Sequence, residues 1–166
     1  MVQLGHIAPV TEPVDPADGA ATALILVAGS LRCALPLDEV IETMRPLAVR
    51  PLAGTPHFVS GISIVRGVPA PVVDLAALLA GERAEVSRFV AVRTGHGPVA
   101  LAVGSVRGIG SAAVTQAGST HGALLGGPAG RLVTGVATLD GEPLLVLRSM
   151  GQLPDEVWAA VAAATS

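Results

Sequence analysis

The residues of this chain that could do chemistry are few, and each familiar catalytic pattern lacks a member. Ser63 stands in the sequence Gly-Ile-Ser-Ile-Val, whereas a nucleophile elbow needs a second glycine two residues after the serine. The histidines could act as general bases or zinc ligands, but they are far apart and have no cysteine or acid at metal-ligand spacing. We interpret them as surface or turn residues. They are His6, His57, His96 and His121.

Three further features invite a chemical interpretation. Residues 108–113 match a dinucleotide-binding fingerprint, but no amphipathic helix follows and no acid appears until Asp140. Acidic residues cluster at 38–42, and a solvated or partner-facing surface is a simpler interpretation of this cluster than an acid/base pair. Cys33 lies in an apolar stretch and reads as a small buried hydrophobe. The sequence therefore predicts no catalytic residue, no metal and no cofactor.

The composition predicts a folded protein that does not bind nucleic acid. Of the 166 residues, 51% are hydrophobic and 14% are charged, unlike a disordered chain. The ten basic residues are all scattered arginines and the net charge is −3, so no basic stripe is available for phosphates. Only three residues are Phe or Trp, which leaves no stacking platform for single strands.

The chain is expected to be cytoplasmic and not inserted in a membrane. Its longest apolar runs, such as residues 20–28, are too short to span a bilayer. Residues 1–19 carry three acids and no arginine, so they resemble a flexible acidic tail and not a signal peptide.

The chain contains an internal repeat. Residues 59–73 align without a gap onto residues 133–147, an offset of 133 − 59 = 74. A weaker match places residues 24–37 over residues 89–103, at an offset of about 65 to 66. The aligned pairs in the first match include Gly61 with Gly135, Gly67 with Gly141, and Pro69 with Pro143.

The repeated units are typical of β-hairpins, because short Val, Ile and Leu runs alternate with glycine-containing turns. Each half would be marginal alone, so we expect two small, partly open barrels that share apolar surface. The predicted lobes cover about 20–80 and about 86–153, with Arg66 and Asp140 at equivalent hairpin tips. A short helix is predicted over 75–80. Residues 111–130 are expected to be a flexible connection.

A C-terminal helix is predicted within residues 154–166. Pro154 stands near its first position and two acids lie in its first turn. Val157, Trp158 and Val161 form its apolar stripe, which is most simply a packing face.

Two segments, 34–42 and 51–75, resemble CheW-like domains. The family shows an I-P-[hydrophobic]-x-x-V-x-E segment, a P-x-x-P-x-[aromatic]-[hydrophobic]-x-G segment and a [hydrophobic]-N-L-R-G-x-x-x-P-[hydrophobic]-[hydrophobic]-D-L segment, and the chain carries matching residues in that order. With the second-half matches, the resemblance covers about 130 residues. It implies an all-β fold of two five-stranded barrels of the Src-homology-three type, packed around a shared apolar core.

The resemblance also implies a non-catalytic adaptor of chemotaxis signal transduction. One surface of such proteins docks on the regulatory domain of a CheA-type histidine kinase, and a groove near the junction of the barrels receives the cytoplasmic tip of a chemoreceptor. Matched by position, the implied receptor-binding residues are Val40, Glu42, Arg66, Val106 and Ile109. Core packing is the alternative for Val40, Val106 and Ile109, and Gly61, Gly67 and Gly141 are expected to be structural turn residues.

The chain departs from the family pattern at three places. Residues 63–65 stand where a hydrophobic residue, Asn and Leu are usual, Gly104 replaces a common Asp, and Arg148 falls where an acid or Asn is common. The second half is therefore open to different binding.

Two other functions stay open at this stage. One is an accessory or scaffold protein of a pilus-motility or other chemosensory-type pathway, and the other is a barrel that binds a small ligand. Arg66 is expected to serve partner binding, and its alternative role is an ion pair with Asp38 or Glu42.

Overall fold

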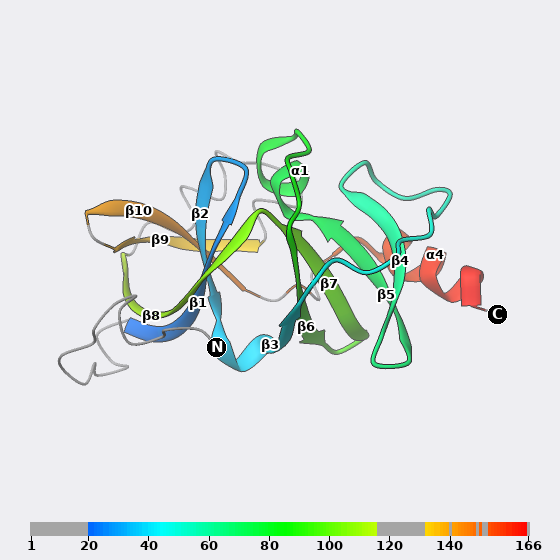
Figure 1. Cartoon of the computed structure of the whole chain (residues 1–166), viewed down its shortest axis with the longest axis horizontal. Coiled ribbons are helices and arrows are strands. Elements are labelled where there is room, and N and C mark those ends of the chain that lie inside the picture. Colours follow the sequence, from blue (N-terminus) through cyan, green and yellow to red (C-terminus); the bar gives the residue numbers. More distant parts are fainter. Residues whose placement is uncertain (1–19, 116–131, 140, 149, 151–152, 166) are drawn as a thin grey trace.

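The computed structural model describes residues 20–115, 132–139, 141–148, 150 and 153–165. Within these residues the protein is mostly β, and the strands form two five-stranded sheets that lie side by side (Figure 1). This confirms the predicted fold class. Asp140, the acidic tail over 1–19 and most of the predicted connection over 111–130 lie outside the described residues.

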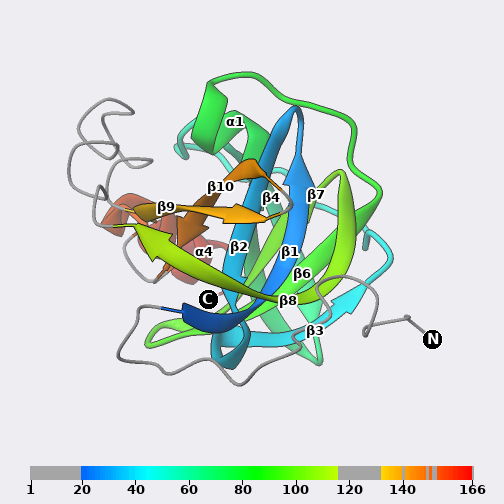
Figure 2. The ribbon, with the colours of Figure 1, turned by 90° about the vertical axis from the view of Figure 1, so that its left-hand side faces the viewer.

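One sheet is a closed barrel and the other is open. Barrel A faces the viewer in Figure 2, and its strands follow the order β1-β2-β10-β9-β8, whereas sheet B follows the order β3-β6-β7-β5-β4. The strands of barrel A are β1 (Ala20–Ala28), β2 (Leu31–Pro36), β8 (Ser105–Thr115), β9 (Val133–Leu139) and β10 (Glu142–Leu147). Those of sheet B are β3 (Val40–Met44), β4 (Val59–Val65), β5 (Val68–Asp74), β6 (Arg88–Thr94) and β7 (Gly97–Val103).

Three short helical elements complete the described fold. A 3-10 turn, η3 (Leu37–Glu39), links β2 to β3, and α1 (Leu75–Ala80) and α4 (Asp155–Thr165) agree with the two predicted helices. Two members of the predicted α4 stripe pack inward, because Val157 is fully buried and Trp158 contacts the core, whereas Val161 is half-buried. Figure 1 shows α4 beside β4 and β5, at the end of the molecule away from barrel A.

The predicted lobe boundaries are wrong, because each sheet takes strands from both halves of the chain. Barrel A joins the hairpin β1–β2 to β8, β9 and β10, while sheet B joins β6–β7 to β3, β4 and β5. The chain crosses between the sheets after β2 and again after β7. The predicted lobes over 20–80 and 86–153 would instead have placed β1 to β5 in one sheet and β6 to β10 in the other.

The strand registers nevertheless preserve the repeat in detail. Gly61 opposes Val72 beside a bulge in β4–β5, and Gly135 opposes Val146 beside a bulge in β9–β10, both at the offset of 74. The parallel pair Val72–Ala100 of sheet B likewise corresponds to Val146–Ala34 of barrel A. Its offsets are 146 − 72 = 74 and 100 − 34 = 66. The two sheets are therefore built on one pattern of pairing.

A single apolar core joins the sheets. On β1, Leu24 and Leu26 point into this shared core, whereas Ile25 points into the interior of barrel A, as the two-residue period of a strand requires. On β6, Val90 and Val92 enter the same shared core. Each sheet also buries a smaller apolar cluster of its own, but the largest cluster is shared between the two sheets, which is the arrangement expected for units of this size.

Asp74 ties the start of α1 to the loop before β4. The buried carboxylate accepts a hydrogen bond from Ala77 N–H at 2.9 Å, and the Asp74 backbone N–H donates to the Phe58 carbonyl at 2.7 Å. Arg83 lies 3.9 Å from the carboxylate and donates to Ser60 Oγ and the His57 carbonyl. The side chain is thus an N-cap embedded in a polar network.

We expect Asp74→Ala to lower the free energy of unfolding by about 1 to 2 kcal/mol, because it removes the cap and leaves the buried Ala77 N–H without its acceptor. Urea unfolding followed by circular dichroism measures the change. Asp38→Ala is the control, since this exposed acid in η3 should change stability by less than about 0.5 kcal/mol. Equal effects of the two substitutions would contradict the role given to Asp74.

Candidate protein-interaction sites

Two of the residues carried over from the family pattern meet in an ion pair. Glu42 lies on β3 and Arg66 lies in the turn between β4 and β5, so they come from opposite edges of sheet B. Arg66 Nε lies 2.5 Å from Glu42 Oε2. Sheet B therefore curls until its edges approach each other. The bridge between Arg50 and Ile62 also extends the β4 edge in this region.

The backbone of Arg66 is in a conformation that arginine disfavours. Val65 pairs with Val68, so the loop has two residues, and both have positive φ, 51° for Arg66 and 79° for Gly67. Two positive φ values are the pattern of a type I′ turn, which prefers Asn-Gly. Arg66 has the sole positive φ among the described non-glycine residues. Such strain is concentrated at functional sites, because the local fold alone does not favour it.

Apolar side chains flank Arg66 on the surface. Ile64 is 60% exposed and Val68 is 44% exposed, and both lie next to the turn. We call Glu42, Ile64, Arg66 and Val68 the hairpin-tip surface. An exposed arginine between exposed aliphatic side chains is a combination found at protein-binding surfaces.

The other three carried-over residues take up a different position. Val40, Val106 and Ile109 are partly exposed and pack against the shared core. Val40 pairs with Val92 on β6, and Val106 pairs with Leu26 on β1, so the two valines are equivalent at the offset of 66. The structure thus brings Glu42 to Arg66, while these apolar residues contribute at least partly to packing.

The three glycines expected to be turn residues differ in their surroundings. Gly67 and Gly141 precede β5 and β10 with φ of 79° and 78°, as hairpin turns require. Gly61 instead lies inside β4, with φ of 151°, next to a bulge. Its assignment to a turn is therefore wrong, and its structural importance comes from the close backbone of Arg50.

The residues that were candidates for catalysis take part in hydrogen bonding, strand pairing and packing. Ser63 is buried and donates a hydrogen bond to the Ala48 carbonyl at 2.6 Å, and Gly108 and Gly110 pair with β1 inside β8. His96 stacks on Trp158 with ring centroids 4.7 Å apart. Within the described ranges, no group of three or more His, Cys, Asp or Glu side chains is placed to hold a metal. The helices described there are also too short or too polar to cross a membrane.

Cys33 is fully buried in the shared core, and burial raises the pKa of its thiol from 9.0 to about 12. The folded protein therefore keeps the proton where the unfolded chain loses it, so stability is full below pH 9 and falls as pH rises toward 12. The sequence has no Lys or Tyr, so few other groups titrate in this range. We expect unfolding free energy to fall by about 1 kcal/mol between pH 9 and 10.

Denaturant unfolding at the two pH values measures this effect, and Cys33→Ala should remove most of it. A pH dependence that persists in that variant would assign the loss to another group.

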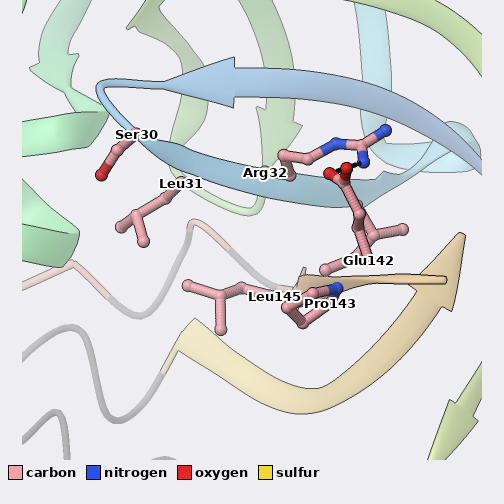
Figure 3. A pocket seen from close by; sticks show the side chains of 7 residues that line it. Ser30, Leu31, Arg32, Glu142, Pro143 and Leu145 are labelled. Carbon is pink, nitrogen blue, oxygen red and sulfur yellow. Dashed lines mark hydrogen bonds and ion pairs between the residues drawn. The ribbon is translucent and has the colours of Figure 1, made fainter.

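A second candidate site lies on barrel A, where sequence reasoning found nothing. A pocket of about 280 Å³ opens between β2 and the start of β10 (Figure 3). We call it the β2–β10 pocket. It is lined by Ser30, Leu31, Arg32, Glu142, Pro143, Leu144 and Leu145.

Arg32 and Glu142 form an ion pair at the rim of this pocket, and Leu31, Pro143 and Leu145 supply its apolar walls (Figure 3). The paired residues are 110 positions apart in the chain. No local motif signals such a contact. The contact depends on the parallel pairing of β2 with β10, which can be predicted only when it is known which hairpins share a sheet.

Comparisons with known proteins agree with this architecture. The family model described as "CheW-like domain" matches residues 22–156. The crystal structure of the scaffolding protein TtCheW from Thermoanaerobacter tengcongensis superposes with a TM-score of 0.63, at 18% identity over 80% of this chain and 91% of that chain. A shorter match, 36% identical over 58 residues, joins 35% of this chain to Protein FrzA of Myxococcus xanthus. That match spans about a third (36%) of the length of FrzA.

Proposed function

Because this chain belongs to the CheW-like domain family, we propose that it is a non-catalytic adaptor coupling chemoreceptors to a CheA-type histidine kinase. In this role it binds the regulatory domain of the kinase and the cytoplasmic tip of a receptor, and it works in the cytoplasm. The proposal needs no bound cofactor and no chemistry by the chain itself.

The observation that carries the proposal is the strained, exposed Arg66. A residue held in a left-handed conformation with its guanidinium on Glu42 is preorganised, so a partner need not order it on binding. Its exposed neighbours Ile64 and Val68 supply apolar area around the charge. We assign receptor binding to the hairpin-tip surface, together with the partly exposed Val40, Val106 and Ile109.

The direct test measures binding of the purified full chain to the regulatory domain of the CheA-type kinase of the same organism and to a receptor cytoplasmic fragment. Calorimetry is expected to give saturable binding to each, and size-exclusion chromatography should recover all three proteins in one complex. Binding to the kinase without the receptor would favour the accessory-protein alternative. Binding to neither, with saturable binding of a metabolite, would contradict the adaptor function.

A further inference from the structure

A surface that is covered by a helix in sheet B has an uncovered counterpart in barrel A. In sheet B, α4 packs against β5, and its Trp158 stacks on His96 in the turn that leads into β7. By the offsets of 74 and 66, β5 corresponds to β10 and His96 corresponds to Ser30 in barrel A. Ser30 and the start of β10 are walls of the β2–β10 pocket. The pocket is thus the counterpart of the surface that α4 covers.

The difference between the halves begins at one residue. Ala84 corresponds to Trp158, since 158 − 84 = 74; Ala84 lies near Gly29 in the β1–β2 turn, and Trp158 stacks on His96 in the equivalent β6–β7 turn. Ala84 presents a methyl group where Trp158 presents an indole. The chain then enters β6 at Arg88, whereas after Trp158 the helix continues to Thr165. Among the described residues, barrel A therefore has no helix in the position of α4.

Arg32 offers a charged contact to a helix that covers the pocket. Arg32 has one ion pair, from Nη1 to Glu142, and its side chain is 27% exposed. Its other guanidinium nitrogens have no acceptor within the described residues. Glu142 is 63% exposed, so its carboxylate can turn away. A partner carboxylate can then take the guanidinium in a charge-assisted hydrogen bond.

We propose that the β2–β10 pocket is a docking site for an amphipathic helix of a partner protein. An aromatic side chain of that helix fills the apolar pocket between Leu31 and Leu145, beside Ser30, as Trp158 lies beside His96 on the equivalent surface. A carboxylate one helical turn earlier binds Arg32. This is the helix-in-groove mode of recognition, with one anchor residue and one charged contact. It is independent of the hairpin-tip surface and of the proposed function.

The α4 sequence itself is the probe for this site, because Asp155 lies three residues before Trp158. The experiment titrates a labelled synthetic peptide of residues 153–165 with the full chain, measured by fluorescence anisotropy. Arg32→Gln should weaken binding about tenfold, because it removes the charged contact. Glu142→Gln should strengthen binding severalfold, because it removes the competing carboxylate. If the ion pair were merely structural, both substitutions would change peptide binding in the same direction.

Matched controls separate this site from others. Arg66→Gln breaks the exposed ion pair of sheet B and should leave peptide binding unchanged, and a peptide with Trp158→Ala should not bind. No saturable binding, or binding insensitive to Arg32→Gln, overturns the proposal, since insensitivity would mean that the peptide displaces α4 from sheet B. Concentration-dependent dimers that disappear in Arg32→Gln would assign the pocket to a second copy and overturn the partner assignment.

Discussion

Gly61→Ala is expected to lower the free energy of unfolding by about 3 kcal/mol or more, a large fraction of the stability of a small domain. A Cβ at this position would lie 2.2 Å from the Arg50 carbonyl oxygen and 2.7 Å from the Arg50 carbonyl carbon. Both are backbone atoms, held by two hydrogen bonds between Arg50 and Ile62 of 2.8 and 2.9 Å. The bridge beside β4 must therefore break before an alanine fits. Guanidinium unfolding followed by circular dichroism measures the loss.

Two other glycines separate the contributions to this effect. Gly67 has a positive φ but open space around it, so Gly67→Ala should show backbone strain alone, about 1 to 2 kcal/mol. Gly95 has open space and no positive φ, so Gly95→Ala should change stability by less than about 0.5 kcal/mol. If Gly61→Ala were no worse than Gly67→Ala, the steric argument would be wrong.

Arg66→Ala should weaken receptor binding tenfold or more while leaving stability and kinase binding nearly unchanged. Truncating an interface arginine that anchors a complex costs about 2 kcal/mol or more, whereas an exposed ion pair contributes about 0 to 1 kcal/mol to folding. Arg66→Asn sharpens the test, because Asn-Gly is the favoured type I′ turn. Asn should raise the unfolding free energy by about 1 kcal/mol by relieving strain, yet lose receptor binding as alanine does.

Calorimetry with a receptor fragment and thermal unfolding of the same samples measure the two effects. Arg32→Gln, which breaks the exposed ion pair of barrel A, is the matched control and should bind receptor normally. A variant at position 66 that binds receptor as tightly as the parent would remove Arg66 from the receptor site. Unfolding of Arg66→Ala would give the residue a structural role instead.

Much of the fold could be predicted from the sequence, because hairpins and repeats are local patterns. The alignment of 59–73 with 133–147 found two hairpins that share a bulge and a register. It could not reveal that β1–β2 pairs with β10 and not with β5. Similarity between repeats is the same whether they pack separately or exchange strands, so the lobe boundaries went wrong.

For the candidate sites too, the residues in motifs could be predicted from the sequence, whereas the contacts that depend on sheet topology could not. Arg66 and Glu42 were found through family motifs, and the possibility of their ion pair follows from opposite charge, but its formation depends on the curl of sheet B. The exposure of Ile64 was not foreseeable, because the strand pattern alone does not say which residues lie outside the core. The β2–β10 pocket depends on residues far apart in sequence and needed the structure.

The exchange of strands between the sheets has a consequence for synthesis on the ribosome. Sheet B is complete once β7 has emerged, but the β1–β2 hairpin must wait for β10, whose last residue follows that of β2 by 147 − 36 = 111 positions. At ordinary translation rates of about 5 to 20 residues per second, that wait is roughly 5 to 20 s. During this wait, Leu24 and Leu26 can be covered only by residues that have already been synthesised. Barrel A therefore closes only after β10 has emerged, and chaperones that hold exposed hairpins have their longest opportunity at the first one.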